Sequence, residues 1–335
     1  MNPNNSPTLQ IHPTRRCNLQ CLHCYSASSP HETEELSSEL LTQVITDASR
    51  EGYQRVSFSG GEPTLYQPLG DLLRHARQLN MRTSLVSNGM LLNERVIEKL
   101  GDAIDVLAIS LDGMPKFHNA MRGNSQAFQI MQGRLEGIRQ AGIPFGFLFT
   151  LTHQNFRHLD WVASFALEQG AALLQIHPLE EAGRAQENLA GVAPSNDIGA
   201  YAYLKAMKLQ ETLGEKLYIH IDLVHQEVLR SHRDRFLAGE ISHNLRDSSL
   251  ANLVSPLIVE ADGMVVPLQY GFGRKYALGN LHEASLAELA RKWYGENYAD
   301  FRELCRNVYR QVTIPQEFPV VNWYEAMMSC AVDKS

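Results

Sequence analysis

Six short β-rich segments alternate with stretches of helical periodicity in the first part of the chain. Apolar residues between the segments recur at helical spacing, as at Leu69, Leu72 and Leu73. Parallel strands need crossover connections, so the alternation predicts an α/β fold with a parallel sheet. Six such units fit either a doubly wound sheet or a partial (β/α)6 barrel of the TIM type. The expected strands are 8–11, 55–58, 83–86, 106–109, 145–149 and 173–176.

Polar residues and glycines follow nearly every expected strand. Both folds place their functional sites beyond the carboxyl ends of the strands. Because parallel strands present those ends at one edge of the sheet, we expect these residues to form one shared site. The segments are 17–24, 60–63, 87–89, 110–113, 150–155 and 177–184.

The composition narrows the classes of partner. The 335 residues, 44% of them hydrophobic, are enough for two domains or for one large barrel with an appendage. Lys and Arg number 30 against 37 Asp and Glu, which gives a formal net charge of −7. This charge gives no general attraction to nucleic-acid phosphates or anionic lipids, so we expect neither nucleic acid nor a membrane as a partner. The sequence has no long apolar run and no signal peptide, which predicts a cytoplasmic protein.

Three of the five cysteines, Cys17, Cys21 and Cys24, lie within eight residues in a CxxxCxxC pattern. An odd, clustered cysteine count in such a chain favours metal chemistry over disulfides. Three thiolates can hold a [4Fe-4S] cluster and leave one iron open to an exogenous ligand. They can also hold structural zinc, with His23 or His12 as the fourth ligand. The spacing alone leaves both interpretations open.

The order of further motifs along the chain resembles the radical S-adenosylmethionine (SAM) superfamily. In that family CxxxCxxC binds a [4Fe-4S] cluster whose open iron chelates SAM. The segment 60–63 is similar to the family's GGEP motif, and 87–89 is similar to its (T/S)NG motif. The segment 110–113, followed by His118 and Arg122, resembles the SLDG pattern of the branch that modifies peptides.

The resemblance implies a role for each matching position. Cys17, Cys21 and Cys24 would bind the one cluster. His23 and Leu179 would lie near the adenine of SAM, Ser110 would bind the ribose, and Arg122 the carboxylate. The remaining positions expected to bind SAM are Ser59, Gly60, Gly61, Glu62 and Asn88, with Glu62 assisting the backbone in holding the SAM amino group.

The resemblance also implies an activity. An external one-electron reductant, such as a flavodoxin or ferredoxin, would supply the electron that cleaves SAM to a 5′-deoxyadenosyl radical, which abstracts hydrogen from the substrate. The SLDG pattern favours a peptide or peptide-derived substrate and reactions such as epimerisation or crosslinking, as in the biosynthesis of peptide natural products. One alternative is a radical SAM enzyme for a small metabolite. The other is a non-catalytic protein with structural zinc.

The C-terminal region resembles the SPASM/twitch extension of this superfamily. We expect a β-hairpin of 256–260 and 264–267, with helices at 285–294 and 298–310. Leu268 stands where the extension normally has a cysteine. Only Cys305 and Cys330 remain, and two thiolates cannot hold an ordinary auxiliary cluster. The cysteines have either no role or a role as hydrogen-atom donors to the substrate radical.

The predicted organisation is therefore a radical SAM core at 1–190, a helical linker at 191–250, and a small α+β SPASM-like region without an auxiliary cluster at 251–335. No catalytic base is assigned from the sequence. Titratable residues that are candidates for substrate contact are His177, Glu180, Glu181, His220, Asp222, His225 and Glu260.

Overall fold

The computed structural model describes residues 6–237 and 249–331. A sheet with the strand order β11-β10-β9-β1-β2-β3-β4-β5-β6-β7 forms its centre. From β9 to β7 all neighbours are parallel. The strands of the predicted core are β1 (Thr8–Ile11), β2 (Arg55–Phe58), β3 (Arg82–Ser87), β4 (Val106–Ser110), β5 (Phe145–Leu151) and β6 (Leu173–Pro178).

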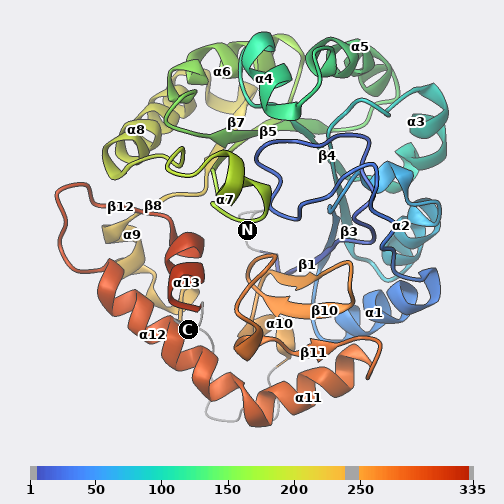
Figure 1. The fold of residues 1–335 in the computed structure, drawn as a ribbon, viewed down its shortest axis with the longest axis vertical. Coiled ribbons are helices and arrows are strands. Elements are labelled where there is room, and N and C mark those ends of the chain that lie inside the picture. Colours follow the sequence, from blue (N-terminus) through green and yellow to red (C-terminus); the bar gives the residue numbers. More distant parts are fainter. Residues whose placement is uncertain (1–5, 238–248, 332–335) are drawn as a thin grey trace.

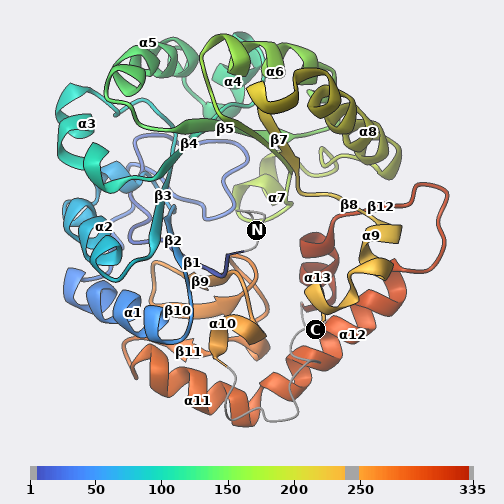
Figure 2. The same ribbon diagram turned by 180° about the vertical axis from the view of Figure 1, so that it is seen from behind.

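The sheet curves into an incomplete barrel, and helices cover its outer face (Figure 1). Strands β7 (Tyr218–Ile221) and β11 (Gly279–Asn280) end the strand order, and the barrel does not close. The view from behind shows the same open ring (Figure 2). The helices between β1 and β6 are α1 (Ser38–Arg50), α2 (Leu69–Gln78), α3 (Glu94–Leu100), α4 (Pro115–Arg122), α5 (Ala127–Gln140) and α6 (Leu159–Glu168). Between β6 and β7 come α7 (Arg184–Asn188), which lies inside the ring, and α8 (Asn196–Leu213).

The two faces of the sheet differ in chemistry. Side chains that point toward the helices are apolar and fully buried, as at Ile11, Phe58 and Ile109. On the other face, partly buried residues are mixed in polarity, with Ser57 and Gln175 beside the apolar Val86 and Leu148. The interior of the barrel therefore offers hydrogen-bonding groups among apolar side chains.

Strand β7 differs from the sequence expectation. The region 191–250 was expected to be a helical linker, and it does contain α8 and α9 (Gln226–Ser231). Between them, β7 pairs in parallel with β6 and extends the core sheet. Its four residues are too few, and too mixed in polarity around His220, to give a clear strand pattern. Residues 238–248 of the expected linker lie outside the described residues.

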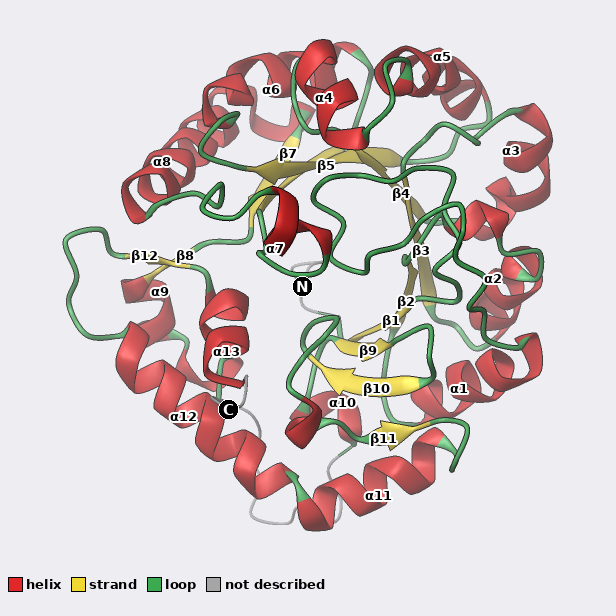
Figure 3. Ribbon diagram, viewed as in Figure 1, coloured by secondary structure: helices red, strands yellow, loops and turns green. Residues whose placement is uncertain are grey.

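The C-terminal region completes the ring. The expected hairpin is present as β9 (Leu257–Val259) and β10 (Met264–Pro267), and β9 pairs in parallel with β1. The expected helices are α11 (Leu286–Glu296), which starts with a capping box at Ser285, and α12 (Tyr298–Val312). The other elements are β8 (Val224–His225), α10 (Leu250–Leu253), β12 (Val320–Val321) and α13 (Trp323–Ala331) (Figure 3).

Within the described ranges, the helices are all too short or too polar to cross a lipid bilayer.

Candidate active site

The loop between β1 and α1 carries the three clustered cysteines and lies across the middle of the ring (Figure 1). Two isolated bridges, Thr14 with Glu35 and Arg16 with Ser29, fold this loop back on itself. The Cys17 and Cys21 side chains are buried, and Cys24 is half-buried. Burial raises the pKa of the Cys17 thiol to about 12 and also raises the pKa of Cys21. The thiols therefore need a cationic centre to become thiolates.

The donor set fits a cluster better than a single ion. In the described part of the chain, no three His, Cys, Asp or Glu side chains come together closely enough to hold one metal ion. Tetrahedral zinc with Zn–S bonds of about 2.3 Å would bring its sulfur ligands to about 3.8 Å from one another. A cubane cluster instead binds each cysteine through a different iron, and three thiols then leave one iron open.

The glycines after β2 allow the cysteine loop to pass close to the sheet. A Cβ atom on Gly61 would lie 2.1 Å from the carbonyl oxygen of Arg16, and Gly60 has a φ of +111°. The amide of Gly61 donates to the Thr14 carbonyl at 2.9 Å, and the amide of Glu62 donates to the Arg16 carbonyl at 2.9 Å. Only glycine fits this approach, so the pair fixes where the cysteine loop lies.

Glu62 joins the ends of β2 and β3. Its buried carboxylate accepts hydrogen bonds from the Ser87 hydroxyl and the Asn88 amide, both at 2.9 Å, and from the Thr64 hydroxyl at 2.7 Å. Burial raises the pKa of Glu62, although these hydrogen bonds act in the opposite direction. The Asn88 side chain donates in turn to Asn18 at 2.8 Å. Glu62 thus holds the segment after β2 against the segment after β3. Its contact with the SAM amino group stays a prediction.

A buried ion pair lies beside Cys21. Arg122 donates through Nε and Nη2 to the carboxylate of Asp112 at 2.7 and 3.1 Å, and its Nη1 lies 3.8 Å from the Cys21 sulfur. His118 and His23 approach the same carboxylate at 3.4 and 3.5 Å. Burial lowers the pKa of His23 to about 4, so its ring is neutral. The guanidinium faces the cysteine loop from the last residue of α4, and a guanidinium can bind an anionic ligand there.

The other predicted SAM contacts occupy different places. The Ser59 hydroxyl lies 3.3 Å from the hydroxyl of Tyr25, a residue that sequence patterns did not single out although it follows Cys24. Ser110 is buried at the carboxyl end of β4. Leu179 packs in a small apolar cluster with Met121. The contacts of these residues with SAM stay predictions.

The sequence candidates at the ends of β6 and β7 do come together. His177 Nδ1 lies 2.8 Å from Asp222 Oδ2, and His177 Nε2 lies 2.6 Å from Glu180 Oε1. His220 Nε2 lies 3.0 Å from the other oxygen of Asp222, and Gln175 donates to Asp222 at 2.9 Å. Burial alone would lower the pKa of His177, but the two carboxylates raise it well above its usual value. This network lines the interior of the barrel on the side of β6 and β7.

The two remaining cysteines lie in the C-terminal helices. Cys305 is buried within α12, and Cys330 is exposed on α13 with its sulfur 3.6 Å from the side-chain oxygen of Gln311. Neither forms a disulfide. A role of either cysteine as a hydrogen-atom donor to the substrate radical stays a prediction.

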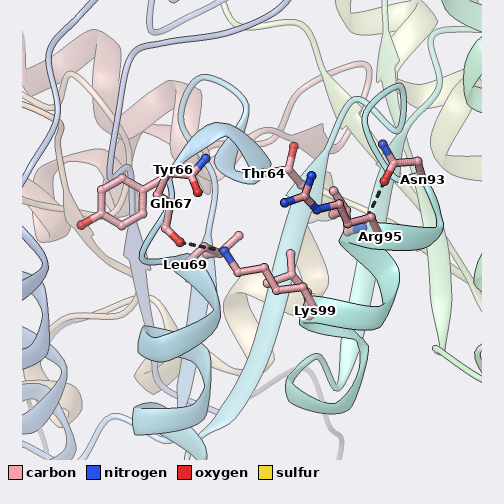
Figure 4. Close-up of a pocket in the computed structure, with 9 residues that line it drawn as sticks. Thr64, Tyr66, Gln67, Leu69, Asn93, Arg95 and Lys99 are labelled. Atoms are coloured by element: carbon pink, nitrogen blue, oxygen red, sulfur yellow. Dashed lines mark hydrogen bonds between the residues drawn. The ribbon is translucent and has the colours of Figure 1, made fainter.

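A pocket of about 300 Å³ opens on the outside of the barrel, between α2 and α3 (Figure 4). Lys99 closes one side by donating to the carbonyl of Gln67 at 3.1 Å. Of the residues described above, Thr64 also lines this pocket; the other lining residues are Tyr66, Gln67, Leu69, Asn93, Arg95, Val96, Lys99 and Leu100. The chemistry is therefore assigned to the interior of the barrel.

This combination of an open parallel barrel and a three-cysteine loop after its first strand defines a radical SAM domain, and residues 11–166 match the Radical SAM superfamily. The chain therefore contains a radical SAM domain, and enzymes of this superfamily use a [4Fe-4S] cluster and SAM. The expected family, partial-barrel fold and cofactors are thereby confirmed, and the zinc interpretation is set aside.

Two kinds of curated relative share sequence with the chain. Fe-coproporphyrin III synthase of Methanosarcina barkeri is 33% identical over 180 residues, which are 53% of this chain and 45% of the relative. The sporulation killing factor maturation protein SkfB of Bacillus subtilis is 27% identical over 285 residues, 85% of this chain and 64% of the relative. The chain thus spans between about half and two thirds of the length of these relatives.

Solved structures share the fold at lower identity. The structure of anSMEcpe with bound AdoMet and the Cp18Cys peptide has a TM-score of 0.66 at 21% identity, covering 98% of this chain and 91% of that one. Streptococcus suis SuiB bound to its precursor peptide SuiA has a TM-score of 0.67 at 16% identity, covering 89% and 66%. These likenesses establish the fold alone.

Proposed function

We propose that the protein is a radical SAM enzyme that modifies a C–H bond of a peptide or peptide-derived substrate, by epimerisation, crosslinking or a related reaction. The observation that carries this proposal is the interior of the barrel. Its lining mixes apolar side chains with hydrogen-bonding groups, and it carries carboxylates at Glu180 and Asp222 on the same edge of the sheet as the cysteine loop. Backbone amides and basic side chains of a peptide are donors that such a surface can bind.

The comparisons support this substrate class. The match to the SkfB maturation protein extends over 85% of the chain and so includes at least part of the C-terminal region. Two proteins of the same fold have been solved with a bound peptide, so the fold can accommodate one.

A tetrapyrrole is the second candidate, because the relatives named as a coproporphyrin synthase and a pre-heme d1 synthase are 33% and 30% identical. These matches cover only 53% and 52% of the chain. Glu180 and Asp222 are both paired with His177, so their charges do not decide between the two substrates. The match to SkfB covers 85% of the chain, and this longer match favours the peptide.

The cluster and SAM supply the hydrogen-abstracting radical, and the chain supplies position and charge. Cys17, Cys21 and Cys24 hold the cluster. Arg122 offers its guanidinium beside Cys21, where the SAM carboxylate would bind. Leu268 stands where the SPASM/twitch extension normally has a cysteine, so the protein contains this one cluster and no auxiliary cluster. The electron comes from an external carrier such as a flavodoxin or ferredoxin.

Substrate-dependent turnover tests this function. The reconstituted protein would be incubated with SAM and a reductant, together with either peptides encoded beside its gene or Fe-coproporphyrin III. We expect a peptide to stimulate formation of 5′-deoxyadenosine and to change in mass when the reaction runs in D₂O. Stimulation by the porphyrin, with every peptide unchanged, would contradict the proposal.

A further inference from the structure

The segment that follows β6 holds the cysteine loop by its backbone. At the start of α7, the amide of Arg184 donates to the Cys24 carbonyl at 3.0 Å. The Arg184 side chain donates through Nε to the Cys21 carbonyl at 2.9 Å and through Nη2 to the Ser28 carbonyl at 2.6 Å. One arginine thus binds three carbonyl groups of the loop, two of them on cysteines. Figure 1 shows α7 beside this loop in the middle of the ring.

Gly183 allows the approach. A Cβ atom at this position would lie 2.2 Å from the carbonyl oxygen of Tyr25 and 2.6 Å from that of Cys24, and the φ of Gly183 is +55°. Atoms this close to backbone cannot be accommodated without moving the loop. The contact between the two segments therefore requires glycine.

The other end of this segment is anchored to the sheet. Glu180 and Asp222 bind the two ring nitrogens of His177. Both ring nitrogens thus face carboxylate oxygens, in keeping with the raised pKa of His177. The amide of Leu179 also donates to the Leu151 carbonyl at 2.8 Å. The segment from 177 to 184 thus runs from a fixed point on β6 to the cysteine loop.

We propose that Gly183 and Arg184 are positioning residues for the cluster: they fix the carbonyls of Cys21 and Cys24 and so hold these cysteines in the orientation that binds iron. The inference rests on the cluster being bound by the three cysteines. Partners outside the metal ligands commonly set ligand orientation, and their loss typically weakens metal binding by about 10- to 100-fold. The sequence places both residues in the segment 177–184 expected at the shared site, but no motif assigns a role to either of them.

Two matched pairs of variants isolate the contact. Gly183→Ala is compared with Gly214→Ala, since the two glycines have nearly identical backbone angles, (55°, −132°) and (57°, −129°), but nothing lies within 4 Å of a Cβ at Gly214. Arg184→Met is compared with Arg139→Met, because Arg139 also donates to a backbone carbonyl, that of Gln169 at 3.1 Å. The backbone conformation of glycine is thus matched within the first pair, and the loss of an arginine that binds a backbone carbonyl is common to the second.

The measurement is the rate at which the reconstituted protein loses iron to a ferrous chelator, followed anaerobically by visible absorbance. We expect Gly183→Ala and Arg184→Met to lose iron about tenfold faster than their controls, or faster. Arg184→Lys, which keeps the charge but not the planar fork, should resemble Arg184→Met. Thermal unfolding of the iron-free proteins shows which variants are folded, and chelation rates are compared only among those.

Chelation rates for Arg184→Met equal to those of Arg139→Met would overturn the proposal, even if Gly183→Ala does not fold. A wild-type rate for Arg184→Lys would overturn the role of the hydrogen bonds. Failure of the wild-type protein to bind iron would instead contradict the proposed function, so the two failures are distinguishable.

Discussion

Replacing Asp112 by asparagine should destabilise the protein strongly, because it breaks a buried ion pair and leaves one charge behind. The Asp112 side chain has no exposed surface, and it accepts two hydrogen bonds from Arg122, whose side chain is 10% exposed. Burial alone would raise the pKa of Asp112, but the guanidinium of Arg122 holds it well below its usual range. Asparagine has nearly the same shape, presents one acceptor oxygen instead of two, and carries no charge.

The expected magnitude follows from this geometry. Removing one partner of a buried pair costs about 3–5 kcal/mol, because the remaining charge is desolvated without compensation. The control is Asp71→Asn, which breaks an exposed pair with Arg74 of similar length, 2.8 Å. Asp71 is 84% exposed, so its loss should cost less than about 1 kcal/mol.

Urea unfolding of the iron-free proteins measures both changes in the free energy of unfolding. Combining Asp112→Asn with Arg122→Met should cost clearly less than the sum of the two single changes, since the second substitution removes the unpaired charge. A loss below about 1 kcal/mol for Asp112→Asn, equal to that of Asp71→Asn, would refute the reasoning.

Three further results are expected. Glu62→Gln should lower the free energy of unfolding by about 1–3 kcal/mol, because an amide nitrogen would face hydrogen-bond donors, and urea unfolding measures it. The folded-state pKa of His177 is raised, so its contribution to stability is present below about pH 6.5 and is lost as the pH rises through the folded pKa. The free energy of unfolding of His177→Phe, measured between pH 6 and 10, should lack this pH dependence. A pH profile equal to that of the wild-type protein would contradict this assignment. The Cys305→Ala and Cys330→Ser double variant should retain about four irons per chain, and a lower iron content by chemical assay would show that these thiols bind a second centre.

Much of the fold is predictable because the core strands obey simple rules. The six expected strands are present, and each differs from the expectation by at most two residues at either end. Strand β7 was not predicted, because its four residues carry no clear strand pattern and its extended structure depends on pairing with β6.

Only those residues of the site that belong to a recognisable sequence motif can be predicted. The cysteines and Glu62 stand in short patterns, but the pattern could not reveal that Glu62 binds Ser87 and Asn88. Arg184 acts on carbonyl groups about 160 residues earlier in the chain, separated by 163 residues from Cys21 and 156 from Ser28. Contacts between a side chain and distant backbone leave no periodic or compositional signal, so only the structure reveals them.

The central claim is that this chain holds one [4Fe-4S] cluster and uses it to cleave SAM. The most direct test is anaerobic reconstitution with iron and sulfide, followed by reduction in the presence of SAM, with 5′-deoxyadenosine and iron measured in the same sample. We expect 5′-deoxyadenosine to form with about four irons per chain. Zinc in place of iron, with SAM left intact, would contradict the account.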